Sequence, residues 1–490
     1  MSDGLAFESA RGRWVLAVAV LGSGMAFLDS TIVNVALPVI GRRLHASTGA
    51  LQWVLNGYLL ALASLILLGG ALGDRYGRRR VFVAGVTLFT IASALCAAAP
   101  STGMLIGARF VQGVGGALLT PGSLAMIDAV FRSEDRARAI GAWSGLAGVT
   151  TALGPLLGGW LIDVASWRAA FLINVPLGAF VVAAAARHVP ETRDPTARGP
   201  LDARGALLAA LVLGGSTYAL IQAPGGALTA AVLAPAVVAV LAAGAFIAAE
   251  RRSANPMLPL GIFASRQFSA ANLVTFVVYA ALGGVFFLLV AFLQVSLGYS
   301  PIAAGAASLP VTVLMLLLSA RSGALAQRIG PRIPLTVGPL VVAGGMLLMA
   351  RIGPGDRYAP DVLPAVVVFG LGLTLVAAPV TATVLAAADA RRAGLASGIN
   401  NAVARVASLL AVAVLPLAGG ITGHRFYDPA AMTHGFHVGM LVCAGLAAAG
   451  GLLAWLTISN DVLGAEDPRE QARADYSCPV AGPPERRRAA

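Results

Sequence analysis

The chain has 490 residues, of which 58% are hydrophobic and only 11% charged, whereas a soluble protein carries about 25% charged residues. Apolar runs of about 20 residues recur along it, and each can cross a hydrocarbon core roughly 30 Å thick. Because these runs are continuous rather than alternating, they predict an all-α integral membrane protein and argue against a β-barrel. The net charge of +12 does not indicate nucleic-acid binding, because the arginines lie in short loops between apolar runs.

Fourteen membrane spans are expected. They lie near residues 14–37, 51–72, 81–99, 104–128, 139–162, 169–187, 204–222, 228–249, 268–293, 303–325, 333–352, 360–387, 394–419 and 435–459. Most loop arginines fall on the face that holds the N-terminus, so the positive-inside rule places both termini in the cytoplasm. All basic residues are Arg, which with the excess of Ala and Gly indicates a GC-rich bacterial genome, and hence a bacterial cytoplasmic membrane.

The first span contains a carboxylate, Asp29, about nine residues before Pro38 at its outer end. At 1.5 Å per residue, Asp29 lies roughly 13 Å below the outer surface. An ionised acid is costly at that depth, so Asp29 must pair with another group or take up a proton. Proton uptake is what a proton-coupling site requires. The alternative is a helix-packing acid that is hydrogen-bonded to Ser30 or Thr31.

The turn between the second and third spans holds an acid followed by a run of arginines. Its charged residues are Asp74, Arg75, Arg78, Arg79 and Arg80. We expect a cytoplasmic latch, in which Asp74 sits at a helix N-terminus of the opposite half and the arginines bridge to nearby acids. The alternative is a loop whose positive charge only orients the chain in the membrane.

The fourth span contains a buried arginine, Arg109, roughly 8 Å below the outer surface and close to the level of Asp29. Such a cation can tune the proton affinity of an acid, either directly or through Gln112 and water. Alternatively, it satisfies backbone carbonyls in the glycine-rich stretch at residues 113–116.

Glycine and proline punctuate the fifth span. The positions are Gly145, Gly148, Gly154, Pro155, Gly158 and Gly159. Small residues allow close helix contact, and Gly and Pro reduce helix regularity. Ordinary tight packing is the alternative interpretation of this pattern.

The thirteenth span contains Arg405 roughly 16 Å deep, beyond easy snorkelling, with Asn400 and Asn401 about one turn earlier. Arg405 is either an anion-facing cavity residue or a buried structural cation. Other polar side chains are candidates to face a central cavity. They are Asn34, Asn56, Tyr58, Gln112, Asn272, Tyr279 and Gln294.

The chain also repeats itself weakly. Residues 70–79 match residues 323–332, and Arg138 and Gly141 match Arg391 and Gly394 at the same offset. A parallel repeat of this kind predicts two six-helix bundles. We place them at residues 1–190 and 256–460, with two inserted spans at 191–255 that should not line the cavity. A disordered cytoplasmic tail is expected at 461–490.

Together these patterns resemble the fourteen-spanner drug:proton antiporters of the major facilitator superfamily. The segments Trp-Arg-Ala-Ala-Phe-Leu-Ile-Asn-Val-Pro at 167–176 and Gly-Tyr-Ser-Pro at 298–301 support the resemblance. It implies a major facilitator fold of fourteen transmembrane helices, in which the first and fourth are neighbours. It also implies drug efflux driven by inward proton flow, with no cofactor, and identifies the fifth-span glycines with the antiporter signature.

Several functions other than multidrug efflux are compatible with a membrane protein of this kind. A fourteen-helix peptide importer has the same span count, but its Glu-x-x-Glu-Arg pattern is absent from the first span. The remaining alternatives are a dedicated exporter of one endogenous metabolite or lipid, and a non-transporting scaffold or sensor. No catalytic or nucleotide-binding motif indicates an enzyme, and the three cysteines lack metal-site spacing. The expected partners of a monomer are a lipophilic, in some cases cationic, small molecule, protons and lipid.

Overall fold

The computed structural model describes residues 4–194, 201–223, 229–253, 255–388 and 393–463. The regular secondary structure of this part of the chain is helical, apart from one isolated bridge between Leu5 and Phe131. Its helices are α1 (Ala10–Leu44), α2 (Thr48–Tyr76), α3 (Arg78–Ala98), α4 (Thr102–Val130), α5 (Ser133–Val164), α6 (Ala169–Leu172), α7 (Asn174–His188), α8 (Ala203–Gln222), α9 (Ala230–Arg252), α10 (Arg266–Val295), α11 (Pro301–Ala307), α12 (Leu309–Ile329), α13 (Arg332–Met349), α14 (Leu363–Ala386), α15 (Ala393–Ala418) and α16 (Pro429–Thr457).

Each of the fourteen expected spans coincides with one of these helices or with a consecutive pair. Thirteen helical segments of the described chain are long and apolar enough to cross a membrane. Helix α5 has 32 residues, but its described apolar stretch is only Leu153–Val164. The all-helical fold class is therefore confirmed, and the count of fourteen spans stays a prediction. The expected disordered tail lies outside the described residues from residue 464 onward.

Serine and aspartate side chains fix the start of several helices. Ser9, Ser47 and Ser101 each accept a hydrogen bond from the backbone N–H three residues further on. Ser300 and Asp428 cap α11 and α16 in the same way. These caps satisfy N–H groups that have no acceptor within the helix, so the sequence itself marks where the loops end.

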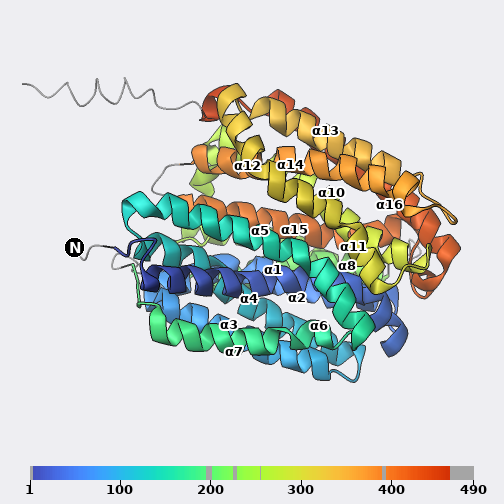
Figure 1. The fold of residues 1–490 in the computed structure, drawn as a ribbon, viewed down its shortest axis with the longest axis horizontal. Coiled ribbons are helices and arrows are strands. Elements are labelled where there is room, and N and C mark those ends of the chain that lie inside the picture. Colours follow the sequence, from blue (N-terminus) through green and yellow to red (C-terminus); the bar gives the residue numbers. More distant parts are fainter. Residues whose placement is uncertain (1–3, 195–200, 224–228, 254, 389–392, 464–490) are drawn as a thin grey trace, which may run out of the picture.

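The long helices run side by side in two groups, α1–α7 and α10–α16 (Figure 1). In the first group α4 packs against α2 and α3, and α1 packs against α5 and α7. In the second group α10 packs against α15 and α16, and α13 packs against α14 and α16. Helices α2 and α15 pack together across the boundary, as do α5 and α11. We call these groups the N-terminal and C-terminal bundles.

The inserted helices α8 and α9 lie at one side of the boundary. Helix α8 packs against α2 and α15, and α9 packs mainly against α8. Only Val232, Ala239, Ala242 and Glu250 are buried in α9, so most of this helix is free to contact lipid. The contacts agree with a peripheral position for the pair, whereas the residue boundaries of the bundles stay predictions.

The two bundles share a detail that reflects the sequence repeat. Gly77 and Gly330 occupy corresponding positions, with φ angles of 114° and 83° that other residues rarely adopt. A Cβ atom on Gly77 would lie 2.6 Å from Glu191 Oε1, and one on Gly330 would press on Asn460. Each turn is therefore closed by a polar side chain that follows the last helix of its own bundle.

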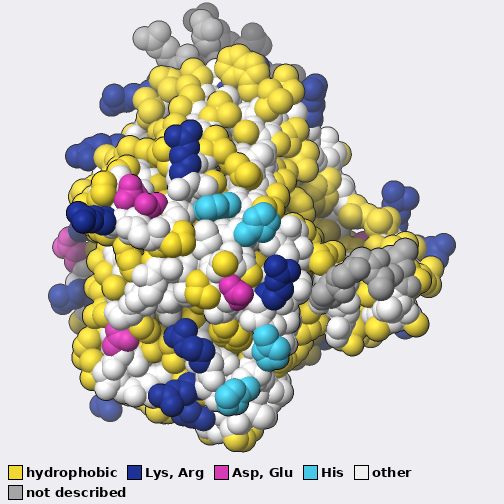
Figure 2. Space-filling model, turned by 90° about the vertical axis from the view of Figure 1, so that its right-hand side faces the viewer, with side chains coloured by type: hydrophobic (Ala, Val, Ile, Leu, Met, Phe, Trp, Pro, Cys, Tyr) yellow, Lys and Arg dark blue, Asp and Glu magenta, His cyan; other side chains and the backbone are white. Residues whose placement is uncertain are grey.

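The ends of the bundles form two faces. We call the face that holds the start of α1 and the end of α16 the terminal face, and the other the opposite face. Figure 2 looks onto the opposite face, where Arg, His and acidic side chains gather and hydrophobic side chains cover the flanks. A polar face beside apolar flanks is the pattern of a protein that spans a bilayer.

Candidate functional site

A buried ion pair lies inside the N-terminal bundle. Asp29 on α1 and Arg109 on α4 are 1% and 0% exposed, and Arg109 Nη1 donates a hydrogen bond to Asp29 Oδ2. Two isolated charges would be costly in this apolar interior, but the pair carries no net charge. The fold therefore holds a titratable carboxylate within the membrane-spanning region next to a fixed cation.

Three further polar side chains complete the network around the carboxylate. Gln112 Nε2 donates to Asp29 Oδ1 at 2.8 Å and to Ser93 Oγ at 2.7 Å, while its Oε1 accepts from Arg109 at 2.6 Å. Asn174 Nδ2 lies 3.4 Å from Asp29 Oδ1 and 3.3 Å from Ser93 Oγ. Helices α1, α3, α4 and α7 thus converge on one acid, whose acceptor oxygens suit the ionised form.

The other contacts of Arg109 fix its guanidinium in place. Its Nε donates to the carbonyl of Val54 at 3.0 Å. The ring of Tyr58 lies 4.4 Å from the guanidinium carbon, and the ring of Phe171 lies 5.9 Å from it. These are cation–π distances, which compensate a buried cation in part.

Asn174 also contributes an acceptor that the network leaves unused. Its amide oxygen is buried and receives no hydrogen bond from the described residues. Asn174 therefore carries a buried acceptor oxygen on the same amide group whose nitrogen lies against Asp29.

The structure thus brings together Asp29, Arg109, Gln112 and Tyr58. It also argues against the two alternative partners considered from the sequence, which were Ser30 or Thr31 for Asp29 and the carbonyls of residues 113–116 for Arg109. Ser30 and Thr31 donate to carbonyls of their own helix rather than to the acid. The described hydrogen bonds of Arg109 go to Asp29, Gln112 and Val54, not to the glycine-rich stretch.

Sequence reasoning missed Ser93, Asn174 and Phe171 as members of this cluster. Asn174 and Phe171 belong to the motif at 167–176, but that motif supported only the family resemblance. Ser93 stands in an apolar run with nothing beside it that marks a buried network.

Hydrogen bonds join the bundles near the opposite face. Gln52 Nε2 donates to the carbonyl of Val412 at 2.7 Å, and Thr48 Oγ1 donates to that of Gly423 at 2.9 Å. Gln294 and Tyr427 make equivalent bonds to the carbonyls of Val35 and Ala46, at 2.9 and 2.6 Å. Burial raises the pKa of the Tyr427 hydroxyl to about 12. The opposite face is therefore closed by polar contacts between the bundles.

The fifth-span glycines form close helix crossings. A Cβ atom on Gly154 would collide with the side chain of Thr31, and one on Gly158 would lie 3.0 Å from Ile32, both on α1. A Cβ atom on Gly159 would lie 2.5 Å from Ile302 Cα in the C-terminal bundle. These glycines let α5 approach both bundles.

Not every residue of that pattern has a close neighbour. The carbonyl of Pro155 faces Gly305 across the bundle boundary, whereas a Cβ atom on Gly145 would meet nothing within 4 Å. The surroundings of Gly148 lie outside what the structure describes.

The loop at Asp74 is tied to its own bundle. Arg78 Nη2 lies 2.8 Å from Asp74 Oδ1, and its Nη1 donates to the carbonyl of Ala125 at 3.3 Å. The Arg79 guanidinium donates to the carbonyl of Val189 at 3.0 Å. Arg75 lies over the Tyr76 ring at 5.4 Å, and Glu191, which sequence reasoning missed, accepts from the Arg79 backbone N–H at 3.1 Å. The expected contact of Asp74 with a helix of the other half is replaced here by the pair with Arg78.

The predicted cavity residues differ in their surroundings. Asn34 donates to the Ser30 carbonyl, and Asn401 is exposed and donates to that of Ser397. Asn400 donates to Thr275 Oγ1 at 2.9 Å and to Asn272 at 3.3 Å, which ties α15 to α10.

Three other cavity candidates lie apart from these. Asn56 is fully buried, and its amide group has no hydrogen-bond partner among the described residues. Arg405 is half-buried near the middle of α15, with Phe27 of α1 5.9 Å from its guanidinium carbon. Tyr279 is also half-buried.

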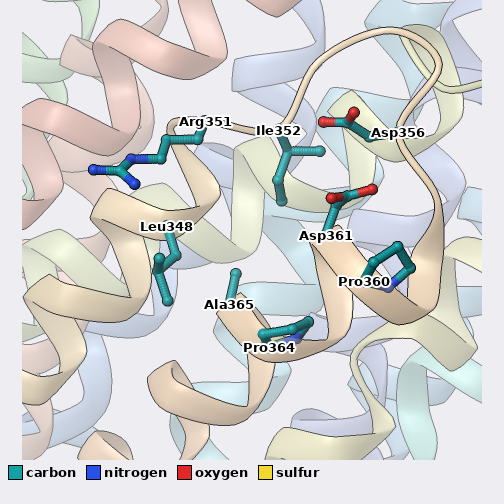
Figure 3. A pocket seen from close by; sticks show the side chains of 8 residues that line it. All are labelled: Leu348, Arg351, Ile352, Asp356, Pro360, Asp361, Pro364 and Ala365. Carbon is teal, nitrogen blue, oxygen red and sulfur yellow. The ribbon is translucent and has the colours of Figure 1, made fainter.

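A small cavity of about 180 Å³ opens at the opposite face, between α13 and the start of α14 (Figure 3). Its walls are formed by Leu348, Arg351, Ile352, Asp356, Pro360, Asp361, Pro364 and Ala365. Both carboxylates are engaged locally, since Asp356 accepts from the Gly353 N–H and Asp361 from the Arg357 N–H, each at 2.8 Å. None of the predicted site residues lines this cavity.

Comparisons with known proteins bear on this arrangement. The family profile of the Major Facilitator Superfamily matches residues 19–412. The multidrug resistance protein Stp of Mycobacterium tuberculosis (strain ATCC 25618 / H37Rv) is 37% identical over 397 residues, which cover 81% of this chain and 73% of Stp. The methylenomycin A resistance protein of Bacillus subtilis (strain 168) is 35% identical, over 92% of this chain and 95% of that protein. The tetracenomycin C resistance and export protein of Streptomyces glaucescens is 37% identical, over 83% and 76%.

Solved structures give the same architecture at much lower identity. The POT family transporter PepTSo has a TM-score of 0.67 at 15% identity, over 91% of this chain and 97% of that one. A bacterial homologue of the human lysosomal transporter Spinster, in an inward-facing and occupied conformation, has a TM-score of 0.66 at 16% identity, over 92% and 98%. Because these identities are so low, both comparisons establish the fold alone.

Proposed function

Because this chain belongs to the major facilitator superfamily, we propose that it is a proton-coupled exporter of drugs or other lipophilic small molecules, which works by alternating access. The observation that carries the proposal is the buried Asp29–Arg109 pair, a titratable acid held next to a fixed cation inside the bundle. The resistance proteins named above are relatives over most of their length, which supports drug export as the direction of transport.

The hydrogen bonds of Asp29 support proton coupling. While the acid is ionised, it accepts from Arg109, Gln112 and Asn174. A proton on Asp29 removes its charge and leaves Arg109 uncompensated, so the guanidinium must shift toward the Val54 carbonyl and Gln112 Oε1, which it already contacts. The new O–H can donate to the free amide oxygen of Asn174. Proton uptake thereby rearranges contacts among four helices of one bundle.

The contacts between the bundles support alternating access. The hydrogen bonds of Gln52, Thr48, Gln294 and Tyr427 hold the opposite face closed. We assign the terminal face to the cytoplasm on the positive-inside rule, so that this conformation is closed to the outside. Asp74 and Arg78 would then form the cytoplasmic latch when the bundles close on the other side.

The exporter is proposed to act in the bacterial cytoplasmic membrane as a monomer that needs only the proton motive force. A second candidate is a dedicated exporter of one endogenous compound. The relatives named for methylenomycin A and tetracenomycin C favour it, because each name gives a single antibiotic.

Reconstituted protein tests the proposal. Proteoliposomes with an imposed pH gradient should concentrate a lipophilic dye, and an ionophore that collapses the gradient should abolish the accumulation. ATP-driven transport in the absence of any gradient would contradict it.

A further inference from the structure

Arg405 is a cation that has no counter-ion within the described part of the chain. It lies near the middle of the 26-residue helix α15, and its guanidinium is 5.9 Å from the ring of Phe27 across the bundle boundary. Among the described residues, none forms an ion pair or hydrogen bond with this guanidinium. A charge at this depth is costly in a membrane, so such a residue pairs with another group or faces a water-filled cavity on a substrate pathway.

The acids of the C-terminal bundle lie in the segments between its helices. The sequences of α10 to α16 contain neither Asp nor Glu. The acid within the first span, Asp29, already accepts from Arg109, Gln112 and Asn174. With that pair neutral, Arg405 leaves one uncompensated positive charge near the boundary between the bundles.

The surroundings of Arg405 are aromatic. Phe27 on α1 faces it, and Ser408, three residues further along α15, donates to the backbone carbonyl of Tyr279 on α10. Helices of both bundles thus bring aromatic residues and one cation together. Rings bind an apolar body, and a guanidinium binds a carboxylate through two parallel hydrogen bonds.

We propose that Arg405 binds the anionic group of the transported substrate, so that this exporter carries lipophilic organic acids in their ionised form. This inference rests on the proposed export function and specifies its substrate class. The positive charge of Arg405 at the bundle boundary favours anionic substrates over the cationic substrates expected from the sequence.

The position of Tyr58 connects this subsite to the proton site. Its ring lies 4.4 Å from the guanidinium carbon of Arg109, while its hydroxyl donates to the carbonyl of Ala26, the residue before Phe27, at 3.4 Å. Because the Phe27 ring faces Arg405, contacts through Tyr58 connect an anion bound at Arg405 to the Asp29–Arg109 pair, so that substrate and proton can affect each other.

Three pyrene probes with the same apolar body test the charge preference: pyrenebutyrate, neutral pyrenebutanol and a pyrenylbutyl-trimethylammonium cation. Energy transfer from tryptophan to pyrene measures binding to the full-length protein in neutral detergent. We expect pyrenebutyrate to bind about tenfold more tightly than the cation. Arg405→Gln should abolish this preference, and Arg405→Lys should retain part of it.

Arg321→Gln is the matched control, because it removes the same charge from an exposed site on α12. It should leave all three affinities unchanged. Equal loss of preference in Arg321→Gln and Arg405→Gln, or no preference in the wild type, would overturn the proposal. A lipid phosphate is the competing ligand. If low mole fractions of phosphatidylglycerol displace all pyrenebutyrate and the acid is not transported, Arg405 binds lipid and the proposal is likewise overturned.

Transport of the probes separates this inference from the export function itself. The proteoliposomes carry a pH gradient and a membrane potential of about 100 mV, negative on the side that the probe leaves. Export of pyrenebutyrate moves one more charge across the membrane than export of pyrenebutanol. The potential should therefore raise the accumulation ratio of pyrenebutyrate by up to about 50-fold relative to that of pyrenebutanol. Transport of the cation without the acid would refute the anion subsite and leave proton-coupled export standing. Failure to transport any probe under a pH gradient would count against both.

Discussion

Replacement of Gly159 by alanine should open the opposite face. The new Cβ atom would lie 2.5 Å from both Ile302 Cα and the Pro301 carbonyl oxygen, whereas carbon atoms in contact are about 3.5–4.0 Å apart. Since both neighbours are backbone atoms, α11 must move away from α5 by about 1 Å. Overpacking of this kind costs about 1–3 kcal/mol.

This cost falls on the closed state alone, because α5 and α11 belong to different bundles that separate when the opposite face opens. The equilibrium should therefore shift toward the open state by a factor of about 5 to 150. Spin labels at Arg43→Cys and Arg357→Cys, both exposed on the opposite face, report the change as a longer distance by pulsed electron resonance. Cys478→Ser removes a background thiol.

Gly145→Ala is the matched control on the same helix, because its Cβ atom meets nothing within 4 Å. It should leave the distance distribution unchanged. If Gly159→Ala gives the same distribution as Gly145→Ala, the crossing of α5 and α11 does not hold the opposite face closed.

Three further outcomes are expected. Asn174→Ala removes the free acceptor beside Asp29, so it should slow proton-driven transport on the order of tenfold while exchange of substrate for substrate, followed with labelled probe, continues. Asp74→Asn removes the partner of Arg78 at a partly exposed site, and stopped-flow transport should slow several-fold while equilibrium probe binding stays within about threefold. Burial raises the pKa of the Tyr427 hydroxyl from 10.0 to about 12. The hydrogen bond from this hydroxyl to the Ala46 carbonyl should therefore stabilise the closed opposite face equally at every pH below 10, and this stabilisation should be lost between pH 10 and 12. The spin-label distance should change over that range with Tyr427 present and not in Tyr427→Phe.

The sequence predicts the charged members of the site because a charge in an apolar run is conspicuous. Asp29 and Arg109 stand out for that reason, and the family resemblance makes their helices neighbours. Ser93 and Asn174 do not stand out, since small polar residues in membrane helices often bond to their own backbone, as Thr31 does here. Their partners become evident only when α3, α4 and α7 are placed around α1.

Interactions across the bundle boundary are the part that the sequence cannot supply. The close crossing of Gly159 depends on which helix lies opposite it. The latch illustrates the same limit, because the spacing of Asp74 and Arg78 by four residues predicts their pair, whereas contact with the other half depends on which face is closed.

Asp29→Asn separates proton coupling from substrate binding. The neutral amide keeps the size of the side chain but cannot exchange a proton. In proteoliposomes loaded with a pH-sensitive dye, addition of substrate to the wild type should drive proton movement in the opposite direction. Asp29→Asn should still exchange labelled for unlabelled substrate, yet move no protons and build no substrate gradient. If Asp29→Asn still concentrates substrate at the expense of a pH gradient, another residue carries the proton and Asp29 is not the coupling site.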